Sequence, residues 1–331
     1  MNARQAMLFA TGLVATGASC LIIHATAPFP DISQLWPKLD YFKQHRDEFD
    51  AVFVGSSRIY HHISPQLFDR TVQERGHEIR SFNFGVHALS PPESFYIVDK
   101  ILELKPRKLR WLFLELAPLP AEIEPKRMGT IRATYWHDWN RTRWVCRKAR
   151  ADAAESGARE LLALHLGLFL KNYANIGRGP DFMSSIGRIF NREKRPAKSL
   201  GPAADGFTPS PDEAWPTDAR EAYAQNLAWL KSKKLPADPT TDDAFRELAL
   251  RVRAASAAPV FVIPPTALPL PPFFEGRGGG ETVFAFNDPA AFPELYQVAL
   301  RSDVEHLNAA GAGVFTQLLA RRFCDYLSNP H

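Results

Sequence analysis

Three residues of the types that together carry out acyl transfer stand at positions that one fold could bring together. Ser57 follows the apolar run 51–54 and a glycine, whereas Asp303 precedes His306 by three residues near the other end of the chain. A separation of three residues lets a carboxylate reach imidazole Nδ1, which leaves Nε2 to take a proton from a serine hydroxyl. We therefore predict Ser57 as nucleophile, His306 as base and Asp303 as the residue that orients it. The alternative for His306 is a cap of the following helix.

The elements that would position these residues follow from the alternation of apolar runs and amphipathic stretches. Between residues 50 and 118, short apolar runs alternate with stretches whose apolar residues recur at helical spacing. This order is typical of an open parallel sheet covered by helices, so we predict an α/β fold, a three-layer α/β/α sandwich. The predicted strands are 51–54, 79–84 and 109–116, and the predicted helices are 64–76 and 90–106.

The carboxyl ends of the predicted strands are the expected ligand-binding edge, as in other open parallel sheets. Residues 55–58, 85–88 and 115–118 should therefore lie close together. N–H groups at the start of the helix that follows the first strand could stabilise an oxyanion there.

The middle of the chain, from about 119 to 240, loses the alternation and is predicted to be a helical insertion or cap. Its clearest helical patterns are 160–173 and 218–230. The alternation then resumes with a helix at 245–252, a strand at 259–263 and a final helix at 314–327. The glycine run at 277–280 lacks a following Gly-Lys-Ser/Thr and is expected to be a flexible loop.

The N-terminus predicts a membrane anchor. Residues 6–27 contain no Asp, Glu, Lys or Arg and would span about 33 Å as a helix. Arg4 on the N-terminal side predicts that this end stays in the cytoplasm and that the main domain is periplasmic. The alternative is a signal peptide cleaved after Ala27, which Pro28 should hinder. We predict an anchor or signal sequence at 1–30 and one domain at 31–331.

Composition argues against several classes of function. The net charge is +4 and the short basic clusters are scattered, so nucleic acid is not an expected partner. The three cysteines show no metal-ligand spacing and no disulfide framework. We therefore expect no metal and no organic cofactor.

Three blocks of the sequence resemble those of the SGNH/GDSL hydrolase superfamily, especially its exported bacterial branches that acylate cell-wall and exopolysaccharides. The blocks are Gly-Ser-Ser-Arg at 55–58, Phe-Asn-Phe-Gly-Val-His-Ala at 82–88 and Asp-Val-Glu-His at 303–306. The resemblance covers residues 50–118 and 242–327. It implies that Ser57 is the nucleophile and that N–H groups of Ser57 and of the turn from Gly85 to Ala88 form the oxyanion hole.

The sequence departs from the family pattern at two places. Ser56 replaces the usual aspartate, and residues 114–118 lack the family's oxyanion asparagine. Loss of one oxyanion donor typically costs a factor of about a hundred to a thousand in rate. Arg58, Asn83 or a residue of the insertion could replace that donor; otherwise catalysis has been abandoned.

Other residues near the predicted site have two interpretations each. Arg58 could bind an anionic substrate or pair with a neighbouring carboxylate. Glu115 is expected to anchor a loop, and the neighbouring pair at 61–62 to be partly exposed and structural. Tyr135, Trp136, Trp139 and Trp144 could form a platform for sugar rings, but packing of the insertion onto the sheet is favoured.

The expected activity is that of an extracytoplasmic serine-dependent esterase or O-acyltransferase, preferentially for O-acetyl groups. The resemblance implies an acylated cell-surface glycan or polysaccharide as substrate and allows a membrane-bound acyltransferase as partner. The sequence does not separate transfer to water from transfer to a sugar. The alternative from another class is a catalytically silent SGNH-like protein that binds glycan or assists assembly.

Overall fold

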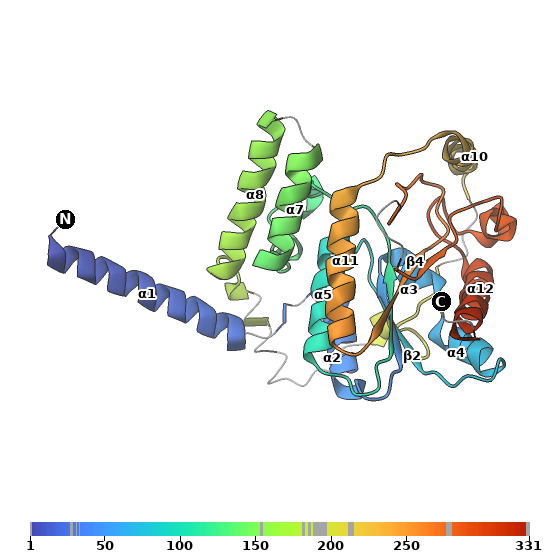
Figure 1. Ribbon diagram of the computed structural model, residues 1–331, viewed down its shortest axis with the longest axis horizontal. Helices are drawn as coiled ribbons and strands as arrows, with labels where there is room; N and C mark the ends of the chain where they lie inside the picture. The colour runs from blue at the N-terminus through green and yellow to red at the C-terminus, as the bar shows by residue number, and fades with distance from the viewer. Residues whose placement is uncertain are drawn as a thin grey trace. The chain divides into compact units, whose positions relative to one another are not determined.

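The computed structural model describes residues 2–26, 29–30, 32, 34–152, 155–180, 183–184, 187, 197–210, 215–275 and 280–328. The predicted cleavage site at 27–28, one of the short basic clusters, which includes residues 191–196, and the glycines at 278–279 lie outside these residues. The chain divides into two compact units (Figure 1). The helical unit comprises Met1–Trp36 and Pro120–Arg195, and the sheet unit comprises Pro37–Leu119 and Pro196–His331. The predicted insertion at about 119–240 is thus divided between the two units.

The sheet unit contains a parallel sheet whose order is β2-β1-β3-β4-β5, with five strands in the described part of the chain. The α/β fold with a parallel sheet is confirmed. The four predicted strands are correct to within two residues, whereas β5 was not predicted. The strands are β1 Ala51–Gly55, β2 Ser81–Gly85, β3 Trp111–Glu115, β4 Ala258–Ile263 and β5 Val283–Ala285.

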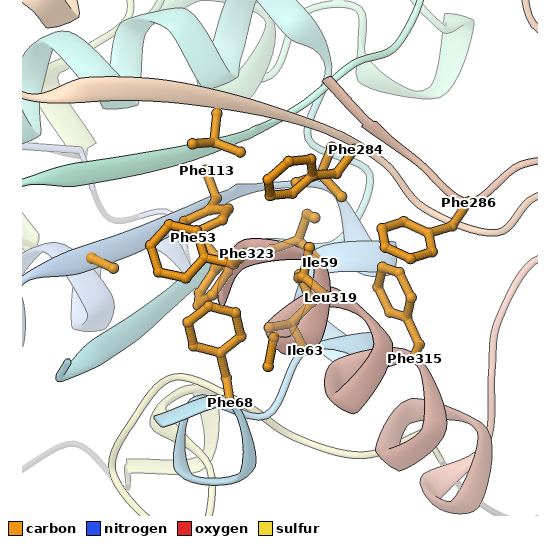
Figure 2. Packing of buried hydrophobic residues seen from close by; sticks show 14 of the residues in the cluster. Phe53, Ile59, Ile63, Phe68, Phe113, Phe284, Phe286, Phe315, Leu319 and Phe323 are labelled. Carbon is orange, nitrogen blue, oxygen red and sulfur yellow. The ribbon is translucent and has the colours of Figure 1, made fainter. Parts of the chain in front are cut away.

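Helices pack on both faces of this sheet. On one face, Phe53 of β1 contacts Phe68 of α4 and Phe113 of β3, which in turn contacts Phe323 of α12 (Figure 2). Aromatic rings of α5 and α11 cover β4 through the contacts Phe95–Phe245 and Phe245–Phe261. The helices associated with the sheet are α2 Leu35–His45, α3 Ser57–His62, α4 Pro65–Gln73, α5 Pro91–Glu103, α10 Thr217–Ser232, α11 Pro239–Ala254 and α12 Ala309–Ser328.

The ends of two of these helices follow directly from the sequence. Ser64 accepts a hydrogen bond from the N–H of Leu67 and Pro65 occupies the first position of α4, where a missing N–H costs nothing. Ser90 and Glu93 form the predicted capping box of α5. Helix α3, which was not predicted, occupies the short segment between β1 and α4.

The helical unit contains α1 Ala3–Thr26, α6 Ile131–Thr134, α7 Trp139–Asp152 and α8 Glu155–Tyr173. The helix predicted at 160–173 is therefore correct. Within α1, the segment Ala3–His24 is long and apolar enough to cross a membrane, and none of its most apolar stretch is buried.

Candidate active site

Ser57 lies at the point where β1 passes into α3. All five residues of β1 are buried, and Ser56 then caps α3 by accepting a hydrogen bond from the N–H of Arg58 at 3.2 Å. Ser57 is the first residue of α3 and is half-buried. Its N–H is one of the first-turn groups that have no acceptor within the helix.

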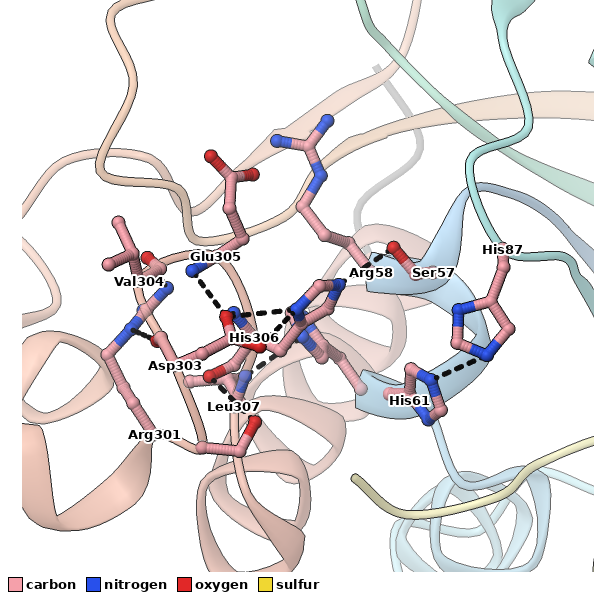
Figure 3. A network of polar contacts seen from close by, with 12 residues as sticks. Ser57, Arg58, His61, His87, Arg301, Asp303, Val304, Glu305, His306 and Leu307 are labelled. Carbon is pink, nitrogen blue, oxygen red and sulfur yellow. Dashed lines mark hydrogen bonds and ion pairs between the residues drawn. The ribbon is translucent and has the colours of Figure 1, made fainter. Parts of the chain in front are cut away.

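Asp303 and His306 lie in the loop that precedes α12, and the loop itself fixes the carboxylate. Asp303 Oδ1 accepts hydrogen bonds from the backbone N–H of Glu305 at 2.7 Å and of His306 at 2.8 Å. His306 Nδ1 lies 2.8 Å from Asp303 Oδ2, and Nε2 lies 2.8 Å from Ser57 Oγ (Figure 3). The structure thus brings the three predicted residues together, linked in series by hydrogen bonds.

The Asp303 carboxylate is held ionised although part of it is desolvated. Burial opposes ionisation, but hydrogen bonds from the His306 ring and from two backbone N–H groups outweigh it and lower the pKa of Asp303. The Asp303 side chain is 55% exposed and that of His306 is 24% exposed. An ionised Asp303 favours the His306 tautomer with a proton on Nδ1, which leaves Nε2 to accept the Ser57 proton.

Two buried groups hold this loop in place. The guanidinium of Arg301 donates to the carbonyl oxygens of Leu295 at 3.2 Å and Val304 at 2.9 Å. His62 Nε2 accepts a hydrogen bond from the N–H of Leu307 at 3.0 Å. His62 is fully buried, so the predicted partial exposure is wrong, and burial lowers its pKa far below the usual value. A neutral His62 can accept this bond, because its Nε2 then carries a lone pair.

Glu115, the last residue of β3, organises the segment around Ser57. Its carboxylate accepts hydrogen bonds from the N–H of Ser56, from Ser56 Oγ at 3.0 Å and from Arg58 Nε at 2.9 Å. The Arg58 side chain is 13% exposed and that of Glu115 is 4% exposed. The structural role predicted for Glu115 is confirmed, and for Arg58 the ion-pair interpretation is correct. The Arg58 Nε–H group is therefore committed to Glu115 and does not face an oxyanion.

Two of the predicted oxyanion donors are committed elsewhere. The side chain of Asn83 is buried and donates to the carbonyl oxygens of Ile59 and Ile63, both at 2.7 Å. Its Oδ1 accepts the N–H of Gly85 at 2.8 Å. The predictions for Asn83 and Gly85 are thus wrong in this structure, because the Asn83 amide ties β2 to the α3 segment and also accepts the Gly85 N–H. Gly85 instead allows β2 and α3 to approach closely, because a Cβ at this position would lie 2.3 Å from the backbone nitrogen of Tyr60.

The other two predicted donors are the turn at Ala88 and the N–H of Ser57. Ala88 is exposed, follows β2 and has a positive φ of 52°, so the chain turns sharply at this position. Buried Lys38 holds the end of β2 against the loop at Gly206. Its Nζ donates to the carbonyl oxygens of Gly85 at 2.7 Å and Gly206 at 2.6 Å. Burial lowers the pKa of Lys38 well below its usual value.

A second pair of histidines lies beside the triad and was missed as part of the site. His61 Nε2 lies 3.2 Å from His87 Nε2, and the His61 ring centroid lies 5.9 Å from that of His306 (Figure 3). His61 Nδ1 lies 2.6 Å from the carbonyl oxygen of Thr208 and donates to it. Burial lowers the pKa of His61 to about 4, so this ring is neutral at pH 7 and its Nε2 accepts a hydrogen bond from His87 Nε2–H. His61 is 7% exposed, which contradicts the predicted partial exposure.

The aromatic segment at 135–144 does not form the sugar platform considered from the sequence. Tyr135, Trp136 and Trp144 are buried, whereas Trp139 is 59% exposed. These rings belong to the helical unit, which contains none of the described strands. A stacking platform requires several exposed faces, so the buried rings are packing residues.

Other chemistry is not indicated in the described part of the chain. There, no group of three or more His, Cys, Asp or Glu side chains could hold a metal ion. The three cysteines are buried and unpaired. No protein-family model matches the chain, and no curated protein is detectably similar to it.

Proposed function

We propose that the protein is a serine-dependent acyl-ester hydrolase or O-acyltransferase. The observation that carries the proposal is the uninterrupted hydrogen-bonded series from Asp303 through His306 to Ser57, which joins residues 249 positions apart in the sequence. A hydroxyl, an imidazole and a carboxylate in this order are the elements that activate a serine nucleophile.

The reaction would proceed in two steps. Ser57 Oγ attacks the acyl carbonyl while His306 Nε2 takes the hydroxyl proton, and the same imidazole then gives that proton to the departing alcohol. The N–H of Ser57 and the turn that ends at Ala88 would stabilise the oxyanion. In the second step His306 deprotonates the acceptor, which attacks the acyl-enzyme; the acyl–Oγ bond then breaks and the imidazole returns the proton to Ser57 Oγ. Water as acceptor gives an esterase, and a sugar hydroxyl gives an acyltransferase.

The position of the triad in the sheet agrees with this proposal. In the strand order 2-1-3-4-5, the chain adds β2 on one side of β1 and the later strands on the other side, so the order switches between β1 and β3. Open parallel sheets bind ligands at such a switch point. Ser57 follows β1, and Glu115 ends β3. We further propose an SGNH/GDSL-like α/β/α arrangement, on the resemblance of blocks 55–58, 82–88 and 303–306.

The substrate that we propose is an acylated cell-surface polysaccharide or glycan, with acetyl as the acyl group. A partly exposed triad suits an ester that projects from a large polymer, because the chain that carries the ester need not enter a closed cavity. We place the sheet unit on the periplasmic side of the membrane, on the charge at Arg4 and the apolar helix α1. A membrane-bound acyltransferase is the partner that would supply acyl groups.

A catalytically silent glycan-binding or assembly protein is the second candidate. It is favoured by the engagement of predicted oxyanion donors elsewhere: the Arg58 Nε–H with Glu115, the Asn83 amide N–H groups with backbone carbonyl oxygens, and the Gly85 N–H with Asn83 Oδ1. A site without oxyanion donors would bind an ester and leave it intact.

The test is turnover by the full-length chain in detergent. We expect hydrolysis of 4-nitrophenyl acetate or transfer of acetyl to glycan oligosaccharides, followed by absorbance and by mass spectrometry. Both activities should be lost in Ser57→Ala and kept in Ser328→Ala, whose hydroxyl bonds only within α12. Binding of oligosaccharides without turnover by folded protein would support the second candidate instead.

A further inference from the structure

The exposed side of α8 is apolar over its C-terminal two thirds. Leu166 is 43% exposed, Leu170 is 61% exposed and Tyr173 is 38% exposed, and Ile176 in the turn that follows is 59% exposed. The remaining exposed positions between 161 and 177 are small or apolar: Ala163, Gly167, Ala174 and Gly177. A surface helix in water normally presents charged or polar residues on this side. We give the name α8 face to these exposed residues of α8 and of the turn that follows it: Ala163, Leu166, Gly167, Leu170, Tyr173, Ala174, Ile176 and Gly177.

Aromatic rings border the α8 face. Trp139 at the start of α7 is 59% exposed and packs edge-on against Phe169, with ring centroids 5.9 Å apart. Phe169 in turn stacks on Tyr173 at 6.2 Å. Tryptophan and tyrosine side chains concentrate at the boundary between hydrocarbon and water, where an apolar ring and a polar N–H or O–H are both accommodated.

Contacts within the helical unit connect this face to the end of α1. Asn175 Nδ2 donates to the carbonyl oxygen of Cys20 at 3.4 Å, and the ring of Tyr173 lies 6.1 Å from that of His24. His24 ends the apolar segment Ala3–His24. Figure 1 shows α8 lying across the direction of α1, beside its C-terminal end. If α1 crosses a bilayer, the α8 face is therefore held at the level where α1 leaves it.

We propose that the α8 face, together with Trp139, lies in the interfacial layer of the same bilayer that α1 crosses. The occupant of this apolar surface is thus lipid. A helix that lies in the plane of the membrane with its apolar side in the headgroup and acyl boundary is an established mode of attachment. The inference rests on the proposed membrane anchor and gives the helical unit a second membrane contact beside α1. It does not depend on the activity of Ser57.

The test uses the full chain in phosphatidylcholine liposomes with a single fluorescent label. Leu166→Cys and Leu170→Cys, in a background with Cys20, Cys146 and Cys324 replaced by alanine, carry an environment-sensitive nitrobenzoxadiazole group. Leu250→Cys is the matched control, because Leu250 is 63% exposed on α11 of the sheet unit. We expect blue-shifted emission at 166 and 170, quenching there by lipids brominated near the headgroup, and protection from aqueous iodide. At 250 we expect none of these effects.

Equal iodide quenching at positions 170 and 250, in variants whose circular dichroism matches that of the parent, would overturn the proposal. Protection from iodide without quenching by brominated lipid, increasing with the protein-to-lipid ratio, would also overturn it and assign the face to a second copy of the chain. Alkaline extraction of the same liposomes tests α1 separately. Fluorophosphonate labelling of the same samples tests the serine, so failure of the membrane contact is distinguished from failure of the proposed function.

Discussion

The carboxylate of Glu115 accepts hydrogen bonds from both the backbone N–H and the hydroxyl of Ser56, the residue that precedes Ser57. Parallel pairing places β3 next to β1, so the end of one strand fixes the chain that leaves the other. Arg58, the residue that follows Ser57, donates a hydrogen bond from Nε to the same carboxylate. Ser57 is thus flanked by two residues that bind one buried carboxylate.

Removal of this carboxylate should therefore destabilise the protein. In Glu115→Ala, Arg58, whose side chain is 13% exposed in the parent, loses its ion-pair partner, and loss of one member of a buried pair costs about 3 kcal/mol. Urea unfolding should show this decrease in the free energy of unfolding. The control Glu221→Ala, at an exposed position of α10, should change it by less than about 0.5 kcal/mol. Equal effects of the two substitutions would contradict the structural role of Glu115.

Gly85 should tolerate no side chain. A Cβ would lie 2.3 Å from the Tyr60 backbone nitrogen, so Gly85→Ala must displace α3 and should cost about 1 to 3 kcal/mol. The control is Gly313→Ala in α12, where a Cβ meets only Leu67 at 3.9 Å and alanine favours the helix. Thermal unfolding of both variants checks the prediction. A Gly85→Ala variant as stable as the parent would show that β2 and α3 are not in close contact.

The sequence was sufficient to predict that Ser57, His306 and Asp303 lie together, but not what surrounds them. Ser57 was found because the end of a buried apolar run is a strand end, and Asp303 and His306 because their contact is local. The oxyanion prediction for Asn83 failed because its amide donates to carbonyl oxygens of the α3 segment, a helix that sequence patterns did not indicate. The prediction for Gly85 failed because its N–H bonds to the Asn83 side chain. The three-residue edge strand β5 and the buried Lys38 depend on contacts between distant segments, which leave no local periodicity.

Asp303 should control the reactivity of Ser57 through the orientation of the His306 ring. Asp303→Asn removes the ionised acceptor that favours a proton on Nδ1, and the equivalent change in a serine protease reduces turnover by about four orders of magnitude. We expect fluorophosphonate labelling to slow by roughly a thousandfold or more. Glu305→Gln, two residues along the loop, should change the rate little. A rate in Asp303→Asn within tenfold of the parent would exclude an orienting role for the carboxylate.

His61 should make stability depend on pH. Its pKa is about 4 in the folded protein and near the ordinary 6.5 when unfolded, so between these values the unfolded state binds more protons. The stabilisation is therefore complete above about pH 6.5 and decreases as pH falls towards about 4. Asp69, whose pKa is raised by burial to about 6, has the opposite effect: its contribution to stability increases as the pH falls. This contribution is the same in the parent and in a His61 variant.

The difference between parent and variant isolates the contribution of His61. His61→Asn places an amide N–H where Nδ1 donates to Thr208 but does not titrate. Urea unfolding at about pH 4.5 and about pH 7 should show a smaller loss of stability on acidification in this variant than in the parent. The same loss in both proteins would mean that His61 is not buried in its neutral form.

Intact-mass analysis of the full-length chain after exposure to a fluorophosphonate tests the activated serine most directly. We expect one adduct, which peptide mapping places on Ser57 and not on Ser56. It should be absent from Ser57→Ala and form much more slowly in His306→Ala. No adduct on folded protein, or an adduct that persists in Ser57→Ala, would contradict a nucleophile at the end of β1.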